Sequence, residues 1–253
     1  MKRLLPIAVT AALGVSVMMA ETPSAPQTDT EDNYRLIEDL VATVISSMPE
    51  ADSLTRYKSL SEEDFIIIAE ELGVEVAAIK AVVRIEAGSA LQGFWAPGVP
   101  VANYSKTLFN RYNRKVKGRK IKDGKVPSGL KGYALREWTA LTNARKINAD
   151  AADMGTYWGM FQIGGYNYKL CDCESVEEMV ERVSESEFSQ LEMFAVFIRK
   201  AGMLDDLRNK NWKGFARKYN GPSYAKRGYH TRMAKEYAKF KKQTEESPKQ
   251  TTE

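Results

Sequence analysis

The sequence predicts a mainly α-helical domain. Apolar residues recur at three- and four-residue spacings in several segments, whereas runs with strand-like alternation are few. The chain has 253 residues, 43% of them hydrophobic, which is enough for one sizeable core with tails on either side. We therefore expect one helical domain, interrupted by loops rich in glycine and proline.

The first 60 residues are expected to lie outside this domain. Residues 1–20 begin with Lys2 and Arg3, continue with an apolar run and end at Ala20, the pattern of a secretory signal peptide. An uncleaved membrane anchor is the alternative. A polar linker is expected over 21–32 and a helical extension over 33–60. The protein is thus expected to be exported, to the periplasm or the cell exterior, and to meet a membrane only through an uncleaved leader.

Glu86 lies on the apolar face of a predicted helix that ends near Gly88. Counting back by three, four and seven residues reaches Val83, Val82 and Ile79. Desolvation of a carboxylate on such a face raises its pKa, so the group can keep its proton near neutral pH. A general acid has this requirement. The alternative is that Glu86 lies at the edge of the apolar stripe and reaches water.

Helical periodicity and capping residues predict the remaining helices. They are expected over residues 61–73, 133–152, 175–200, 212–219 and 224–240, with a disordered tail over 241–253. Residues 92–132 are rich in Gly and Pro and are expected to be irregular, with short strands, where loops contact a substrate. The basic residues within 111–125 indicate a solvated loop or a surface that attracts carboxylates.

Residues 155–168 combine glycines with aromatic side chains and one glutamine. The glycines oppose an amphipathic helix, so we expect a turn. Aromatic faces beside short polar groups suit a sugar ring, which offers C–H faces and hydroxyls. Aromatic residues that only pack a tight turn are the alternative, and Trp158 either stacks on a sugar or lies in the core.

Composition argues against several function classes. The net charge is +4, and without Lys2 and Arg3 the 35 basic and 33 acidic residues leave +2, which gives no support for nucleic-acid or membrane-surface binding. The chain has one histidine, and Cys171 and Cys173 are one residue apart, a spacing that strains a disulfide and does not fit a zinc knuckle. We expect buried thiols, no metal and no cofactor.

Three stretches in a fixed order carry a resemblance to known enzymes: Ile85–Gly88, Trp158–Ile163 and Tyr219–Pro222. The order resembles the lysozyme and lytic transglycosylase superfamily, and more closely the N-acetylmuramidase domain family of phage endolysins and bacterial cell-wall enzymes. The resemblance implies a lysozyme-like helical domain over 61–240, with a short β-hairpin or irregular loop region that lines the cleft.

The resemblance also implies a reaction. The family cleaves the β-1,4 bond between N-acetylmuramic acid and N-acetylglucosamine, so the expected partners are the glycan strands of peptidoglycan. Protonation of the leaving oxygen requires an acid, and Glu86 is expected to be that catalytic residue. The protein is thus expected to be a glycoside hydrolase of the lysozyme type.

Five further residues are expected to bind substrate because of their positions in the motifs. Thr156 and Gln162 are expected to hydrogen-bond the substrate or Glu86. Tyr219 and Asn220 are expected to form the cleft wall near the cleavage point, and Tyr157 to stack on a sugar.

Two features leave the activity open. Asp150 and Asp153 are candidates for a second carboxylate, or are solvated acids at a helix end. Without a second carboxylate, Glu86 would act as acid and then base, and a lytic transglycosylase would leave 1,6-anhydromuramic acid ends. Asn110 and Tyr112 stand where the family commonly has Glu and His, so a non-catalytic peptidoglycan-binding protein is a third possibility.

Overall fold

A computed structural model describes residues 60–88 and 91–246 of the chain. The expected signal peptide, linker and nearly all of the helical extension lie outside the described residues, as does the end of the expected tail. None of the described helices is both long enough and apolar enough to cross a membrane.

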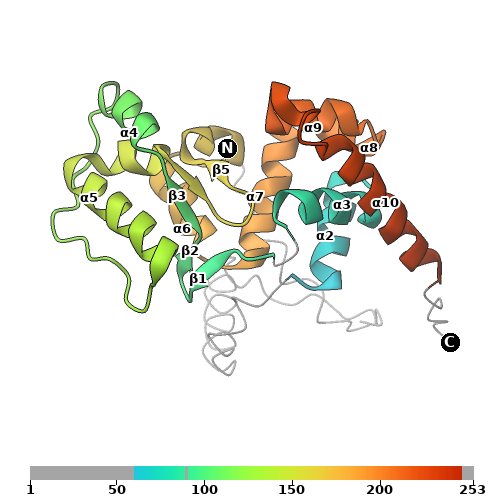
Figure 1. Ribbon diagram of the computed structural model, residues 1–253, viewed down its shortest axis with the longest axis horizontal. Helices are drawn as coiled ribbons and strands as arrows, with labels where there is room; N and C mark the ends of the chain where they lie inside the picture. The colour runs from blue at the N-terminus through green and yellow to red at the C-terminus, as the bar shows by residue number, and fades with distance from the viewer. Residues whose placement is uncertain (1–59, 89–90, 247–253) are drawn as a thin grey trace, which may run out of the picture. The chain divides into compact units, whose positions relative to one another are not determined.

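The described chain is mainly helical, with small antiparallel sheets, which confirms the predicted fold class (Figure 1). Its α-helices are α2 (Glu62–Leu72), α3 (Val76–Glu86), α4 (Lys106–Asn113), α5 (Gly132–Met154), α6 (Val176–Val183), α7 (Glu187–Lys200), α8 (Leu204–Arg208), α9 (Trp212–Asn220) and α10 (Tyr229–Glu246). The 3-10 helices are η3 (Gly165–Cys171) and η4 (Pro222–Tyr224). The strands are β1 (Phe94–Ala96), β2 (Val99–Pro100), β3 (Ala102–Tyr104), β4 (Thr156–Trp158) and β5 (Ile163–Gly164).

Helix α2 begins and ends where local signals predict. The Ser61 side chain accepts a hydrogen bond from the backbone N–H of Asp64, and the Asp64 carboxylate accepts one from the backbone N–H of Ser61 at 2.7 Å. These bonds satisfy donors that a helix start leaves open. Gly73 ends the helix in the left-handed conformation, with φ of 60°.

The sheets are short and bring distant segments together. β1 and β2 form an antiparallel pair, and β3, β4 and β5 form a second antiparallel sheet in that order. Asn103 on β3 lies opposite Tyr157 on β4, and Trp158 lies opposite Ile163. The predicted turn within 155–168 therefore joins β4 to β5.

Helix α4 was not predicted, because the surrounding residues 92–132 are rich in glycine and proline and contain many basic side chains, which predicted irregular structure. Ser105 caps it by accepting a hydrogen bond from the backbone N–H of Leu108 at 3.3 Å, and Phe109 is buried. One buried side chain in eight residues leaves too weak an apolar stripe to detect in the sequence.

Helix α7 lies at the centre of the described fold. Figure 1 shows it between α4, α5, α6 and the strands on one side and α2, α3, α8, α9 and α10 on the other. Leu191, Phe194 and Ile198 are fully buried along it. The Phe194 ring stacks on Phe161 of the β4–β5 turn, with centroids 4.1 Å apart. This packing fixes the turn against the helical core.

The C-terminal helix differs from its predicted bounds at both ends. Gly221 and Gly228 have φ of 72° and 67°, and η4 lies between them, so α10 starts at Tyr229 rather than at Tyr224. It continues to Glu246, so the disordered tail predicted from residue 241 begins too early. The residues of the last turns, 241–246, are all exposed, so they form no apolar stripe from which a helix could be predicted.

Candidate active site

Glu86 is the last residue of α3, and the helix orients it as the apolar pattern predicts. Ile79, Val82 and Val83 are fully buried, and Glu86, on the same face one turn further, is partly buried. The side-chain amide of Asn220 donates a hydrogen bond from Nδ2 to Oε1 of Glu86 at 2.9 Å. Glu86 is therefore held by a neutral partner at the edge of the core.

Burial raises the pKa of the Glu86 carboxyl to about 7. The hydrogen bond from Asn220 and the positive charge of Arg232 act in the opposite direction, but burial outweighs both. Glu86 can therefore hold a proton near neutral pH, where an ordinary glutamate is ionised. A group in this state can donate a proton and then accept one.

Tyr219 connects the end of α9 to the β4–β5 turn. Its hydroxyl donates a hydrogen bond to the backbone carbonyl of Phe161 at 2.7 Å. Its ring stacks on Phe215 and meets Phe194 edge to face, with centroids 6.0 and 5.5 Å apart. Burial raises the pKa of Tyr219, and the charge of Glu86 raises it further. The tyrosine thus stays protonated and fixes the helix end that carries Asn220.

Gln162 holds a strained backbone in the same turn. Its φ is 52°, a left-handed conformation that costs about 1–2 kcal/mol for a residue with a side chain. The side-chain amide compensates, since Nε2 donates to the carbonyl of Gly159 at 2.7 Å and Oε1 accepts from the Asn103 amide. These bonds are to the turn and to β3 rather than to Glu86.

Two predicted contact residues, Thr156 and Tyr157, differ in their access to a substrate. Thr156 is fully buried, and its hydroxyl donates to the carbonyl of Ala152 at 2.8 Å, so the predicted contact with substrate or Glu86 is wrong. Tyr157 is partly buried, and its ring meets that of Tyr166 edge to face at 6.4 Å. Trp158 is a core residue, with 1% of its surface exposed.

The family model for N-acetylmuramidases matches residues 75–241, a span that contains Glu86, the β4–β5 turn and Asn220. The chain belongs to the N-acetylmuramidase family. A solved structure titled "Crystal structure of Burkholderia AP3 phage endolysin" is similar over 80% of this chain and 76% of that one, with 28% sequence identity and a TM-score of 0.62. A comparison with curated proteins found no significant match. Membership of the N-acetylmuramidase family supports a peptidoglycan hydrolase.

Polar and aromatic residues that the sequence did not single out extend this N-acetylmuramidase site. The side-chain Oδ1 of Asn103 accepts a hydrogen bond from the Tyr133 hydroxyl at 2.6 Å, which continues the chain of bonds that starts at Gln162. Tyr133 is 51% exposed and meets Trp95 edge to face at 6.0 Å. The strand pairing that places Asn103 beside the turn could not be read from the sequence.

Gln190 on α7 forms hydrogen bonds that hold the β4–β5 turn. Its Oε1 accepts from the backbone N–H of Met160 at 2.8 Å, and its Nε2 donates to the carbonyls of Gly93 and Val183 at 3.2 and 2.9 Å. A Cβ at Gly93 or Gly159 would lie only 2.7 Å from this side chain. Both glycines are thus required by the close approach of Gln190, which ties the turn to the loop after α3.

Glu187, one turn before Gln190, is a second acid with a raised pKa. Burial raises the pKa of its carboxyl to about 7, and 5% of the residue is exposed. Its Oε1 accepts from the backbone N–H of Gly93 at 3.3 Å. The carboxyl therefore holds the same loop, and its burial separates it from bulk solvent.

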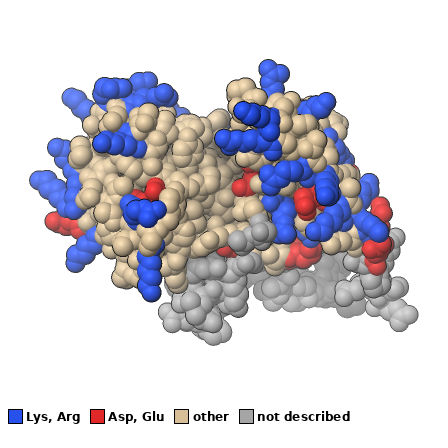
Figure 2. All heavy atoms as spheres, in the orientation of Figure 1, with Lys and Arg blue, Asp and Glu red and all other residues tan. Residues whose placement is uncertain are grey.

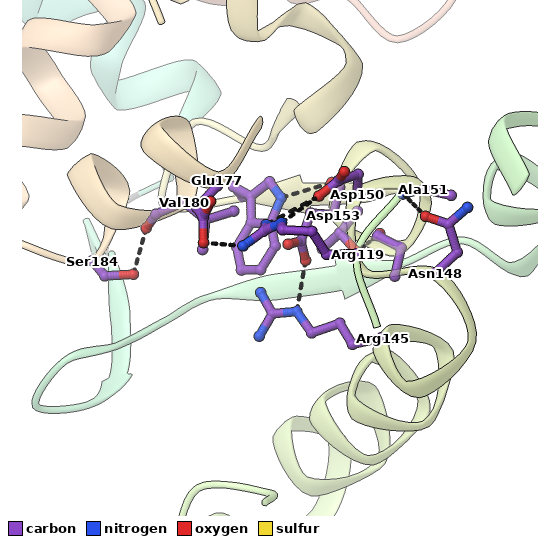
Figure 3. Close-up of polar contacts among 12 residues, drawn as sticks. Arg119, Arg145, Asn148, Asp150, Ala151, Asp153, Glu177, Val180 and Ser184 are labelled. Atoms are coloured by element: carbon purple, nitrogen blue, oxygen red, sulfur yellow. Dashed lines mark hydrogen bonds and ion pairs between the residues drawn. The ribbon is translucent and has the colours of Figure 1, made fainter. Parts of the chain in front are cut away.

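Asp150 and Asp153, the candidates for a second carboxylate, both bind arginines (Figure 3). Asp153 is 3% exposed, and its Oδ1 accepts from Nε of Arg145 at 2.7 Å. Asp150 accepts from Nε of Arg119 at 3.0 Å, and Arg119 also pairs with Glu177. Arg119 thus links the loop before α5 to the start of α6. Both aspartates therefore take part in ion pairs that hold the fold together.

The described residues contain no group of three or more His, Cys, Asp or Glu side chains arranged to hold a metal ion. Cys171 and Cys173 are free and buried, and burial raises the pKa of the Cys171 thiol to about 12. Neither thiol is thus available as a thiolate at neutral pH.

Proposed function

We propose that this protein cleaves the β-1,4 bond between N-acetylmuramic acid and N-acetylglucosamine in peptidoglycan, with Glu86 as the general acid. The observation that carries the proposal is the setting of Glu86, which combines a partly buried position, a neutral amide partner and a pKa of about 7. The family match and the similarity to an endolysin support the choice of substrate.

Asn220 fixes which oxygen carries the proton. Its Nδ2 donates to Oε1 of Glu86, so Oε1 acts as an acceptor and the proton lies on Oε2. Glu86 passes this proton to the glycosidic oxygen as the bond to the anomeric carbon breaks. The carboxylate left behind is stabilised by the Asn220 amide and by the charge of Arg232, which both favour its ionised form.

The second half of the reaction returns the proton. A water molecule adds to the anomeric carbon, its proton goes to Glu86, and the cycle closes with a new reducing end. A pKa near the working pH suits a group that must act first as acid and then as base. The pKa of about 7 places Glu86 in that range.

Exposed and partly exposed rings are available to bind the sugars. Trp95 and Tyr133 on one side, and Tyr157 with Tyr166 on the other, offer aromatic surface beside the amides of Asn103 and Gln162. Figure 2 shows a hollow with a mostly uncharged surface between the part that contains α5 and the part that contains α9. Neutral N-acetyl sugars fit a groove of this character, because their C–H faces pack on rings.

A lytic transglycosylase is the second candidate, and the pairing of Asp150 and Asp153 with arginines favours it. If Glu86 is the acting carboxyl in both steps, it can take the proton of the muramic acid 6-hydroxyl. That oxygen then bonds to the anomeric carbon and leaves a 1,6-anhydro end. No water molecule is consumed on this route.

One digest tests both candidates. Purified peptidoglycan is treated with the wild type, with Glu86→Gln and with Glu63→Gln, a control at an exposed acid on α2, and the ends are identified by mass spectrometry. Reducing ends that disappear with Glu86→Gln support the hydrolase, and anhydro ends support the transglycosylase. Binding of the wild type without cleavage would reject both and leave a binding protein. A substrate outside the cytoplasm also fits the predicted signal peptide.

A further inference from the structure

A pocket between the end of α3 and the start of α10 adjoins the proposed acid. It has a volume of about 350 Å³ and is lined by Arg84, Ile85, Gly88, Arg232, Lys235 and Glu236. Ile85 and Gly88 flank Glu86 in the sequence, and the charge of Arg232 acts on Glu86 directly. The pocket therefore lies near the proposed acid, with Arg232 as the lining residue whose charge reaches Glu86.

The two helices are held side by side in a way that fixes this pocket. Tyr237 of α10 donates a hydrogen bond to Glu75, just before α3, at 2.7 Å. The other end of α3 therefore meets the first turns of α10, where Arg232 and Lys235 lie three residues apart on one face.

The lining is predominantly cationic. Arg84, Arg232 and Lys235 supply three positive charges, and Glu236 is the acidic member. Glu236 also forms an ion pair with Lys239 at 4.0 Å, outside the lining. Arg232 lies over the ring of Tyr229 at 5.9 Å, which restricts its position. Figure 2 shows basic side chains gathered over the region of α3 and α10.

We propose that this pocket binds a carboxylate of the peptide stem on the muramic acid next to the cleaved bond. The inference rests on the proposed function, because it places that sugar beside Glu86. In a strand that bears stems both sugars are neutral, because the lactyl carboxyl of muramic acid is bound to the peptide as an amide, whereas the stem peptides carry free carboxylates. Arginine and lysine bind carboxylates through charge-assisted hydrogen bonds, and arginine can do so through two parallel bonds. The site thus selects glycan that bears acidic stems.

Occupancy of the pocket also favours catalysis. The charge of Arg232 lowers the pKa of Glu86 against the larger effect of burial. A carboxylate held by Arg232 offsets that charge, so Glu86 keeps its proton more readily when the stem is bound. Substrate binding and protonation of the acid then support each other.

Binding tests the inference independently of catalysis. Insoluble peptidoglycan is prepared in native form and with its carboxylates converted to neutral methylamides, and the Glu86→Gln variant is co-sedimented with each. The double change Arg232→Gln with Lys235→Gln, made in that background, is expected to weaken binding to native material about tenfold. On the methylamide material the same change is expected to alter binding less than about twofold.

A matched control removes the same charge elsewhere. Lys213→Gln with Lys242→Gln neutralises two exposed lysines outside the pocket lining, and any change in binding reports general attraction between a basic protein and an acidic polymer. Circular dichroism verifies that every variant is folded. Equal weakening by the pocket pair and the control pair, or equal weakening on both materials, overturns the inference.

Cleavage separates this inference from the proposed function. With Glu86 restored, the pocket pair is expected to lower kcat/KM about tenfold more on native peptidoglycan than on the methylamide form, because the effect of the Arg232 charge on Glu86 is common to both substrates. Cleavage that depends on Glu86 but not on stem carboxylates leaves the function standing and rejects the pocket. Carboxylate-dependent binding without any Glu86-dependent cleavage supports the pocket and rejects the function.

Discussion

Two partly or fully buried carboxyls at helix ends, Glu86 on α3 and Asp153 on α5, invite comparison. Burial raises both pKa values, to about 7 for Glu86 and about 6 for Asp153. The partner differs, since Glu86 accepts from the neutral amide of Asn220 and Asp153 accepts from the guanidinium of Arg145. The positive charge of Arg145 opposes the rise in the pKa of Asp153, and the amide of Asn220 opposes the rise in the pKa of Glu86. Burial alone therefore does not identify an acid catalyst: the guanidinium of Arg145 pairs with Asp153, whereas the hydrogen-bond partner of Glu86 is uncharged.

The largest expected effect is the loss of kcat when Glu86, at the end of α3, is replaced. Glu86→Gln keeps the shape of the side chain but removes the transferable proton, and general acid catalysis contributes about 10²- to 10⁴-fold to such reactions. We expect kcat on peptidoglycan to fall about a thousandfold, with binding to sacculi retained. Release of soluble fragments under matched enzyme concentrations measures the change.

Glu63→Gln, which removes an exposed carboxyl from α2, is the control and should cleave as the wild type does. If Glu86→Gln kept a tenth or more of the wild-type activity, Glu86 would not be the general acid. The contrast with Asp153, which has a structural role, would then be lost.

The next largest effect is on the free energy of unfolding, when the ion pair of Asp153 near the end of α5 is broken. Arg145→Met leaves the 3%-exposed Asp153 without its cation, and breaking a buried pair in this way costs about 3 kcal/mol. Urea unfolding should show this loss, whereas cleavage per folded molecule should stay near the wild-type value.

Arg119→Gln provides the matched comparison, because its pairs with Asp150 and Glu177 are more exposed. We expect it to cost under about 1 kcal/mol. An Arg145→Met protein that is as stable as the wild type would show that the Asp153 pair contributes nothing to the fold.

Glu86 should also affect stability, with the sign opposite to that of a salt-bridged acid. Its folded pKa of about 7 lies above the ordinary value of 4.5, so the folded state binds the proton more tightly and stability falls as pH rises from 4.5 through 7. Above that window an ionised Glu86 costs about 3 kcal/mol, and Glu86→Gln should recover most of it.

Unfolding of the wild type and Glu86→Gln at pH 4 and pH 8 tests this expectation. The variant should gain stability at pH 8 and little at pH 4. An equal difference at both pH values would mean that the carboxyl titrates normally in the folded protein.

The smallest effect concerns the neutral partner. The amide of Asn220 favours the ionised form of Glu86, so Asn220→Ala should raise the pKa of Glu86 further. The alkaline limb of the kcat/KM profile should then move upward by roughly half a pH unit to one unit, together with a loss of about tenfold in kcat from poorer orientation. A downward shift of that limb would contradict the assignment of the limb to Glu86.

The sequence predicted those parts of the site that depend on local order. The spacing of Ile79, Val82 and Val83 identified the buried face of α3, and Ser61 and Gly73 marked the ends of α2, because caps and stripes involve residues within a turn or two. The order of the motifs identified Asn220 as a residue of the site. Helical periodicity could not have identified it, because Asn220 is 134 residues from Glu86 in the sequence.

The remaining features depend on tertiary packing. Thr156 has a hydroxyl that could bind a substrate, but the residue is fully buried on β4, which lies between β3 and β5. Asp153 meets Arg145 across a break in α5 at Asn148, where the backbone leaves the helical conformation, so helical spacing did not predict the pair. Asn103 and Tyr133 join Gln162 through the β3–β4 register, which no local pattern sets.

Titration of the Glu86 carboxyl tests most directly whether this residue keeps a proton at neutral pH. Carbon-13 NMR of glutamate-labelled protein follows each side-chain carboxyl with pH, and the signal missing from Glu86→Gln identifies the residue. We predict a midpoint of about 7 for this signal. A midpoint near 4.5, the ordinary value for glutamate, would contradict the proposed role of Glu86 as the acid.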